Sequence, residues 1–326
     1  MNQFLGKVVT DFGASLSSSL AYIGQKLGLY KALASNGPLT PAELAEKTNT
    51  TERYVREWLV NQAAGGYVEY DAESERYTLT PEQAVALTDE QSPFFVGGGF
   101  FVIKAMSQAV ERIEGHFVNG GGMLWGEHHP DLFIGTERFF RPGYTAHLVS
   151  SWIPALDGVE EKLKAGAKVA DVGCGHGAST IIMAKAYPNS EFWGFDNHEA
   201  SIAYAKRAAE EAGVADRVHF EVSNAQSIPD QQFDLIAFFD CLHDMGDPVG
   251  ACKRAAEVLK ADGTALIVEP MAGNNVQDNF NPIGRTFAGA STLCCTANSM
   301  ALDGPALGAV ATEDRLKEVV LSGGFK

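Results

Sequence analysis

The stretch VADVGCGHGAST, residues 169–180, decides the fold class of this chain. Apolar residues lead into three glycines, Gly173, Gly175 and Gly177, and a helix-forming segment follows directly. A strand that turns through glycines into a helix brings backbone N–H groups close to a ligand, because no Cβ blocks the approach. We therefore predict a ligand-binding loop after the leading strand of an α/β sheet.

The chain continues this pattern from residue 168 onward. Apolar segments that favour strands are KVADVG, EFWGFD, VHFEVS, FDLIAFF and TALIVE, and the helical segments between them are ASTIIMAKAY, EASIAYAKRAAEEAG and PVGACKRAAEVL. Near-continuous apolar strands that alternate with helices are typical of a parallel sheet covered on both faces. The sequence thus predicts a Rossmann-like α/β domain in its second half.

The first 90 residues predict helices followed by a β-hairpin. Thr40 and Glu43 have the spacing of a capping box, and a second helix begins at about Thr51 and stops at Gly65 and Gly66. YVEY and RYTLT then flank the polar turn DAESE, which indicates two short strands. Two helices and a hairpin in this order make a winged helix.

Charge argues against a nucleic-acid partner for this winged helix. The chain has 25 Lys and Arg against 41 Asp and Glu, a formal net charge of −16, which repels phosphate backbones. Arg53 and Arg56 of the second helix alternate with acids, and the wing turn is acidic apart from Arg76. A wing that approaches phosphates should be basic. We expect a packing or dimerisation module.

The sequence gives little support for a membrane segment, an oxidising compartment or a metal site. The longest apolar stretch, FFVGGGFFVI at 94–103, is about half the ~20 residues of a membrane helix. Five scattered cysteines suit a reducing cytosol, so we expect a cytoplasmic protein without a membrane partner, and Cys294 and Cys295 as small buried residues. His128 and His129 are adjacent and point apart on an extended chain, so we predict no metal.

Polar residues follow three of the predicted strands. Asp171 stands just before the glycines, Asp196 ends the second strand, and Asn224 and Ala225 follow the third. The carboxyl ends of parallel strands meet in one crevice. An acid at Asp171 suits a ligand with an ammonium group and disfavours a pyrophosphate, although G-x-G-x-x-A spacing is present. Alternatively, Asp196 is a helix cap and Asn224 a turn residue.

This combination resembles the class I S-adenosylmethionine-dependent methyltransferases over about residues 160–326. DVGCGHG is similar to their first motif, FDN to their ribose-binding acid and SNAQ to their adenine-binding turn. The resemblance implies S-adenosylmethionine as the cofactor, with Asp171 towards its amino group. The cofactor-lining residues that it implies are Asp171, Gly173, Gly175, Asp196, Asn224, Ala225 and Asp240.

The segment FFDCLHDMGDP is similar to a motif of the winged-helix O-methyltransferases of plants and bacteria. By that resemblance His243 is a general base that takes the acceptor proton, and Glu269 orients it. Two departures stand out: Val310 occupies the place of the family's second acid, and a methionine replaces the usual tryptophan. The alternative is that His243 only caps or packs its loop.

The winged-helix half is similar to the same family, in which it dimerises and helps to close the acceptor pocket. The resemblance implies a homodimer and three parts: a winged-helix dimerisation domain at 1–90, a helical connector and acceptor-pocket segment at 91–160, and a cofactor-binding domain at 161–326. FFRPGYTAHLVSSWIPALDG, ahead of the first motif, offers Arg141 and Tyr144 as substrate contacts.

We predict an S-adenosylmethionine-dependent enzyme that methylates a small organic acceptor on oxygen. N- or S-methylation remains open, and so does a transcription regulator that senses the cofactor, which would need a basic face. A nicotinamide-dependent oxidoreductase would need a catalytic Tyr-x-x-x-Lys pair on its Rossmann sheet, and residues 161–326 contain none. Such methyltransferase sheets normally end in an antiparallel hairpin, so we also expect that these last strands are missing from the sequence.

Overall fold

The computed structural model describes residues 1–326 and separates them into two units. Unit 1 comprises Met1–Lys104 and Ile134–Pro142, and unit 2 comprises Ala105–Phe133 and Gly143–Lys326. The segment 91–160, for which we expected a separate connector, is therefore divided between the two units. Two of its helices, α6 (Gly97–Gln108) and α8 (Asp131–His147), run across the boundaries.

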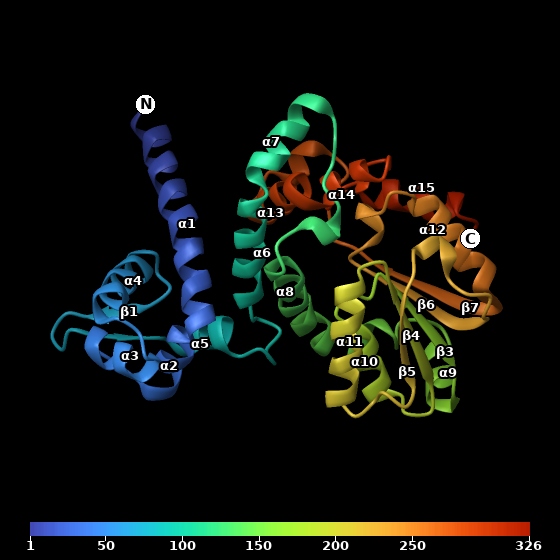
Figure 1. The fold of residues 1–326 in the computed structure, drawn as a ribbon, viewed down its shortest axis with the longest axis horizontal. Coiled ribbons are helices and arrows are strands. Elements are labelled where there is room, and N and C mark those ends of the chain that lie inside the picture. Colours follow the sequence, from blue (N-terminus) through green and yellow to red (C-terminus); the bar gives the residue numbers. More distant parts are fainter. The chain divides into compact units, whose positions relative to one another are not determined.

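Residues 1–90 of unit 1 form a winged helix preceded by a long helix, drawn in blue to cyan in Figure 1. Its elements are α1 (Asn2–Leu27), α2 (Leu29–Asn36), α3 (Pro41–Thr48), α4 (Glu52–Ala64), β1 (Glu69–Asp71), β2 (Arg76–Thr78) and α5 (Pro81–Thr88). The predicted capping box is present: the Thr40 N–H donates to Glu43 over 2.8 Å, and the Glu43 N–H donates to the Thr40 hydroxyl. Trp58 and Leu59 of α4 are buried in the core of this unit.

Glycines allow α6 and α8 to cross closely within unit 1. A Cβ at Gly98 would lie 2.5 Å from the backbone nitrogen of Phe139, and one at Gly135 would lie 2.7 Å from that of Val102. Only glycine fits such a backbone approach. The apolar run FFVGGGFFVI is thus largely one half of a helix crossing.

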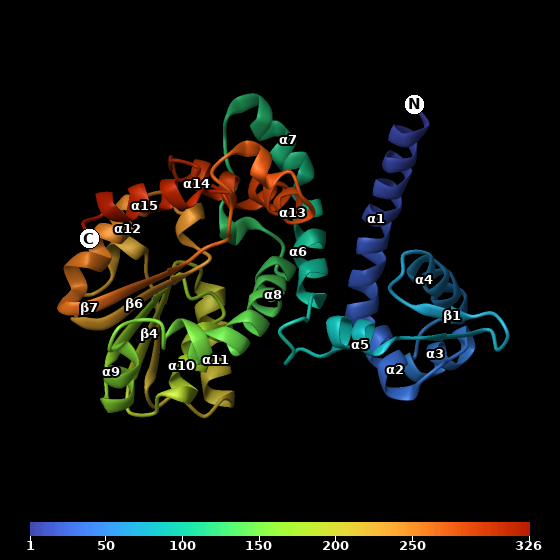
Figure 2. The same ribbon diagram turned by 180° about the vertical axis from the view of Figure 1, so that it is seen from behind.

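Unit 2 is built on a five-stranded parallel sheet in the order β5-β4-β3-β6-β7. Its strands are β3 (Lys168–Val172), β4 (Glu191–Asp196), β5 (Val218–Val222), β6 (Phe233–Phe239) and β7 (Leu259–Val268). Helices α10 (Ala178–Ala186) and α11 (Glu199–Glu211) pack against β4 and β5, whereas α12 (Pro248–Val258) packs against α15 (Glu313–Ser322), as Figures 1 and 2 show. The predicted Rossmann-like α/β fold with a winged helix is confirmed.

The remaining elements of unit 2 are helices and helical turns. They are α7 (Val110–Asn119), η1 (Trp125–Glu127), the π-helix η2 (Leu148–Trp152), α9 (Val159–Ala165), η3 (Ala225–Ser227), η4 (Leu242–Asp244), η5 (Val276–Asn279), α13 (Pro282–Ala290), the π-helix η6 (Ser291–Cys295) and α14 (Thr296–Ala301). No helix of the structure has both the length and the apolar character that crossing a bilayer demands.

The last strand is longer than the sequence indicated. The predicted strand TALIVE begins at Thr264, but β7 begins at Leu259. Leu259 pairs with Phe233, and the register shifts before Leu235 pairs with Thr264. The Lys260 ammonium donates to the Asp234 carboxylate over 2.8 Å and 2.9 Å, so an ion pair holds the irregular stretch against the sheet.

The strand order places a crevice beside β3. From β3 the chain proceeds outward to β4 and β5, and then returns to place β6 on the other side of β3. Ligands of doubly wound sheets bind outside the carboxyl ends of the strands at such a reversal. The candidate site therefore lies at the residues that end β3, β4, β6 and β7.

Candidate active site

The glycine turn leads from β3 into α10 with its backbone in the left-handed region. Gly173, Gly175 and Gly177 have φ values of 75°, 52° and 78°. A Cβ at Gly173 would lie 2.7 Å from the Cys241 sulfur, whereas a Cβ at Gly175 would meet nothing within 4 Å. Gly173 is thus required by packing, and Gly175 presents bare backbone to open space.

Asp171 is buried beneath this turn with one unsatisfied oxygen. Its Oδ2 accepts hydrogen bonds from the Ser179 and Thr180 hydroxyls, both at 2.6 Å, while its Oδ1 is buried without a partner. Burial raises the pKa of the carboxyl to about 6. A buried acceptor without a donor is costly, and an ammonium group of a ligand would remove that cost.

Asp196 closes β4 next to the turn. Its Oδ2 accepts the Gly175 N–H at 2.9 Å and its Oδ1 accepts the His198 N–H at 2.8 Å, and burial raises its pKa. The N-cap of α11 is His198, so the alternative role of Asp196 as a helix cap does not apply. Each oxygen keeps a lone pair for a ribose hydroxyl.

Two aromatic rings that the sequence analysis missed continue from His198, the residue whose N–H bonds to Asp196. The His198 ring lies 4.3 Å from Phe133, and Phe133 lies 5.5 Å from Trp125, as measured between ring centroids. Phe133 and Trp125 precede the glycine turn by about forty or more residues in the sequence, so no local pattern could have indicated them. They supply an apolar wall of the kind that a nucleoside base contacts.

Asn224 and Ala225 lie beyond β5, at the start of η3. Asn224 is the N-cap of this turn but makes no side-chain capping bond, and its side chain is exposed. The Ser223 N–H donates to the Asp196 carbonyl oxygen at 3.0 Å, which ties the two strand ends together. The structure thus places Asn224 near Asp196 with its amide available.

Asp240 follows β6 in a strained conformation. Its φ of 52° is unusual for a residue other than glycine, and its N–H donates to the Val268 carbonyl oxygen at 2.8 Å. The Tyr144 hydroxyl donates to Asp240 Oδ2 at 2.7 Å, and burial raises the pKa of Asp240 to about 7. Strain of this kind gathers at functional sites. Two predicted residues, Tyr144 and Asp240, are in direct contact.

His243 and Glu269 form a buried pair at the same edge of the sheet. Glu269 accepts a hydrogen bond from His243 Nδ1 and another from the Leu242 N–H at 2.7 Å. The side chains of His243 and Glu269 are only 6% and 5% exposed. Glu269 therefore fixes both the ring and the loop that carries it.

Cys294 and Cys295 follow one another in η6. Both were expected to be small buried residues, and Cys294 is buried, but Cys295 is half-buried. Burial alone would lower the pKa of His243, but its bonds to Cys295 and Glu269 outweigh burial and raise that pKa well above its ordinary value. The Cys294 and His243 hydrogen bonds lower the pKa of Cys295 to about 5.

Arg141 is not brought together with the other predicted residues. Within unit 1 it pairs with Glu90 at 2.8 Å and with Glu137 at 3.2 Å, and Arg138 pairs with Glu90 at 3.0 Å. These ion pairs bind the α8 segment to the loop after α5. A substrate role for Arg141 has only the sequence resemblance to support it.

The histidine pair at 128–129 has separate roles. His128 is buried and its pKa is lowered by burial, so it is neutral, while His129 Nδ1 lies 3.3 Å from Asp131. The structure contains no group of three or more His, Cys, Asp or Glu side chains that could hold a metal ion.

Comparisons with known proteins agree with this architecture. Residues 163–319 match the family model described as a methyltransferase domain, and residues 14–89 match that of an Rv2258c-like winged HTH domain. The chain carries a methyltransferase domain. The predicted combination of a methyltransferase domain and a preceding winged-helix domain is confirmed.

Curated relatives of the methyltransferase domain act on different acceptor atoms. The 27-O-demethylrifamycin SV methyltransferase of Amycolatopsis mediterranei is 36% identical over 103 residues, which cover 31% of this chain and 38% of that enzyme. The norajmaline N-methyltransferase of Rauvolfia serpentina is 26% identical over 152 residues, 43% of this chain and 51% of that enzyme. The chain thus matches about half of these relatives or less.

Solved structures extend the likeness to the whole fold. Human N-acetylserotonin methyltransferase, solved in complex with S-adenosylmethionine, has a TM-score of 0.71 and covers 99% of this chain and 92% of its own, at 17% identity. At that identity the likeness establishes the fold. The unsatisfied oxygen of Asp171, the open position at Gly175 and the acceptor oxygens of Asp196 fit the predicted cofactor, S-adenosylmethionine.

Proposed function

We propose that this protein transfers a methyl group from S-adenosylmethionine to the hydroxyl of a small organic acceptor, with His243 as the general base. The observation that carries the proposal is the buried His243–Glu269 pair at the sheet edge that also holds Asp171 and Asp196. Glu269 on Nδ1 orients the ring and leaves Nε2 for an acceptor proton.

The cofactor supplies an activated methyl group, and the residues of this chain hold it and manage the proton. Asp171 offers Oδ1 to the ammonium group, and Asp196 offers its oxygens to the ribose hydroxyls. His243 is protonated at rest because its pKa is raised, so it must first release that proton. Once neutral, His243 accepts the proton of the acceptor hydroxyl, and the acceptor oxygen must lie in line with the methyl–sulfur bond for transfer.

We infer the type of acceptor atom from the His243–Glu269 pair. An oxygen acceptor has a hydroxyl proton to lose, whereas a neutral amine attacks with its own lone pair and needs no base at the moment of transfer. A buried histidine oriented by a carboxylate therefore supports O-methylation over N-methylation. S-methylation of a thiol is the second candidate, because a thiol also has a proton to remove.

The test is the His243→Gln variant, followed by S-adenosylhomocysteine production with a panel of phenolic and aliphatic hydroxyl acceptors. Loss of a general base should lower turnover by about 10²–10⁴-fold, and the affinity for S-adenosylhomocysteine by calorimetry should not change. The Asp196→Ala variant is the counterpart, because it should lose cofactor affinity. Near-normal turnover in His243→Gln would reduce His243 to a structural role.

We also propose that the winged helix does not bind nucleic acid. The arginines of α4 are paired on their own helix, Arg53 with Glu57 and Arg56 with Glu52. In the hairpin, Arg76 pairs with Glu43 at 2.7 Å. These cations are already neutralised, which leaves an acidic wing. A transcription regulator that senses the cofactor would need a free basic face on the winged helix. Binding to random DNA in a gel-shift assay at physiological salt would contradict our proposal and support that alternative.

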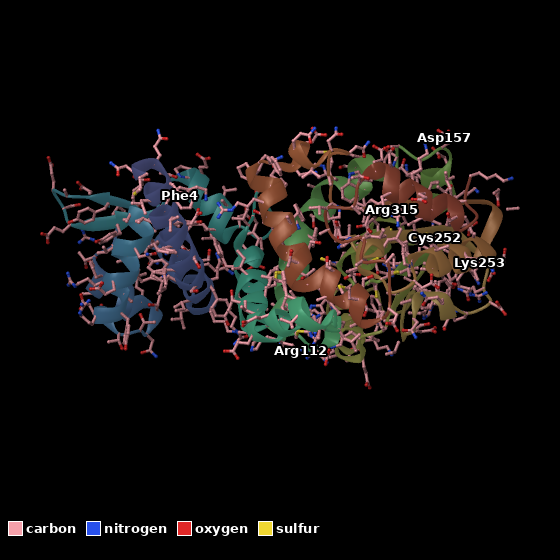
Figure 3. All side chains as sticks on the ribbon, turned by 90° about the horizontal axis from the view of Figure 1, so that it is seen from above. Phe4, Arg112, Asp157, Cys252, Lys253 and Arg315 are labelled. Carbon is pink, nitrogen blue, oxygen red and sulfur yellow. The ribbon has the colours of Figure 1, made fainter.

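The winged-helix unit instead offers a surface for a second copy of the chain. Helix α1 carries an apolar stripe at Leu5, Val9, Phe12, Leu16 and Ile23, with exposures of 53%, 66%, 65%, 67% and 41%. Phe4, also on α1, is labelled in Figure 3. Spacings of three, four and seven residues are those of a coiled-coil seam, and an apolar stripe of this length in water favours pairing. We propose a homodimer through this stripe.

The location follows from the cysteines. All five carry free thiols, which suits a reducing compartment, and we propose the cytoplasm on that ground.

A further inference from the structure

We propose that Asn298 is a positioning residue of methyl transfer, whose side-chain amide fixes the loop that carries His243 and anchors this loop to the segment at Trp125. The inference rests on the proposed function, because it takes His243 as the general base. The three residues that form the link, Trp125, Asp244 and Asn298, all belong to unit 2.

The amide of Asn298 joins two segments that lie far apart in the sequence. Asn298 is on α14 and is 9% exposed. Its Nδ2 donates to the Asp244 carbonyl oxygen at 2.9 Å, and its Oδ1 accepts the Trp125 N–H at 2.8 Å. The orientation of the amide is settled by these partners, since a carbonyl needs a donor and an N–H needs an acceptor.

Helix α14 and the loop after it hold three consecutive carbonyl groups of the loop that carries the base. The Gly308 N–H donates to the His243 carbonyl oxygen at 3.0 Å, and the Ser299 hydroxyl donates to the Met245 carbonyl oxygen at 2.8 Å. These two bonds lie on either side of the one made by Asn298. The middle carbonyl is thus the one that the amide ties onward to a second segment.

Glu269 holds the same loop from the side of β7. Its carboxylate accepts the Leu242 N–H at 2.7 Å and the His243 ring at Nδ1. It therefore sets the plane of the ring and the start of the loop, whereas the bonds from α14 set the carbonyl groups that follow. A general base must lie within about 2.6–3.2 Å of the group that it deprotonates, so the position of Nε2 depends on both supports.

The segment at Trp125 is a firm anchor for the amide. The Met123 N–H donates to the Ala297 carbonyl oxygen at 3.0 Å, which is a second bond between this segment and α14. A Cβ at Gly122 would lie 2.2 Å from the backbone nitrogen of Ala301, too close for any side chain. The segment and α14 thus run in backbone contact, and the amide is held between them and the loop.

The experiment is a double-mutant cycle on the full-length protein with Asn298→Ala, His243→Gln and the double variant. Turnover is measured as S-adenosylhomocysteine formed at saturating S-adenosylmethionine, with the hydroxyl acceptor of the same panel that reacts fastest. Asn298→Ala alone should lower kcat by up to about 10²-fold. In the His243→Gln background it should lower kcat by less than about twofold, because no base is left to position.

The outcomes separate this inference from the proposed function. Losses that multiply in the double variant, or a normal kcat in Asn298→Ala, would overturn the role of Asn298 while His243→Gln still shows the general base. Near-normal turnover in His243→Gln removes the base, and the positioning role with it.

Ser190→Ala is the matched control for stability. The Ser190 hydroxyl is buried, donates to the Leu163 carbonyl oxygen at 2.6 Å and accepts the Ala167 N–H at 3.0 Å. It therefore also links two backbone groups, but at the amino ends of β3 and β4. Ser190→Ala should lower the thermal midpoint and leave kcat unchanged. A loss of kcat equal to that of Asn298→Ala would assign Asn298 to stability alone.

Hydrogen exchange gives a readout that needs no acceptor. In Asn298→Ala the amides of residues 240–247 should exchange about tenfold faster, because the loop loses a buried bond and opens more often. Exchange in the same peptide should not change in Ser190→Ala, and S-adenosylhomocysteine binding by calorimetry shows that both variants are folded. Unchanged exchange in Asn298→Ala would mean that the amide does not hold this loop.

Discussion

Asp171 has one carboxylate oxygen that accepts two hydroxyl hydrogen bonds and one that accepts none. The sequence predicted an acid facing an ammonium group at this position, because Asp171 stands two residues before the first glycine. It did not predict that Ser179 and Thr180, in the first turn of α10, would hydrogen-bond to the carboxylate. Those two hydroxyls orient the group so that Oδ1 is left for a ligand.

The Asp171→Asn variant tests the cost of this burial. The folded pKa of Asp171 is raised from 3.8 to about 6, so its contribution to stability is present below pH 3.8 and is lost as the pH rises through 6. The neutral amide should therefore stabilise the ligand-free protein by up to about 3 kcal/mol at pH 8, with little gain at pH 4.

Denaturant unfolding at the two pH values measures this, and S-adenosylhomocysteine affinity should fall in the same variant. A stability gain equal at both pH values would show that the charge of Asp171 is not its source.

Helices α6 and α8 cross within unit 1 through glycines that the sequence showed only as an apolar run with three glycines. Adjacent positions in that run differ sharply. A Cβ at Gly98 would meet the Phe139 backbone at 2.5 Å, whereas a Cβ at Gly99 would meet only the Phe139 ring, at 3.5 Å. The first contact is too short for any side chain, and the second is an ordinary van der Waals contact.

The matched pair Gly98→Ala and Gly99→Ala should have opposite effects on stability. Both gain about 1 kcal/mol of helix propensity, but the first must separate two backbones, which costs about 1–3 kcal/mol for an overpacked contact. Thermal unfolding should show a lower midpoint for Gly98→Ala and an equal or higher one for Gly99→Ala. Equal midpoints in the two variants would mean that the helices do not cross here.

At the scale of the whole molecule, the exposed apolar stripe on α1 is a surface that a single copy of the chain does not cover. Two glutamates in place of Val9 and Leu16 would put charges into the proposed seam. We expect this variant to sediment as a monomer at concentrations where the unaltered chain is a dimer, because burying unpaired charges at an interface is unfavourable.

Ala14→Glu is the control, since Ala14 is exposed on the same helix but outside the stripe. Analytical ultracentrifugation measures the oligomeric state of the unaltered chain, the double variant and Ala14→Glu. If the double variant remains dimeric, or if Ala14→Glu dissociates equally, the α1 stripe is not the dimer seam.

The amino-acid sequence by itself determined the elements and the cofactor edge of this protein. Strands, helix caps and the glycine turn are local patterns, since residues within a few positions of one another set them, and the strand ends of a parallel sheet must meet at one edge. Thr40 with Glu43, the glycines after β3, and Asp196 at the end of β4 were therefore all readable.

Only the tertiary structure decided which distant side chains meet in that crevice. Tyr144 reaches Asp240 across 96 positions, and the Asn298 side chain of α14 donates to the Asp244 carbonyl oxygen of η4 over 2.9 Å. Such contacts depend on how helices pack and on where a helical turn widens, and neither leaves a periodic trace in the sequence. Burial follows from the same packing, so the pKa values of Asp171, His243 and Cys295 were also beyond sequence reasoning.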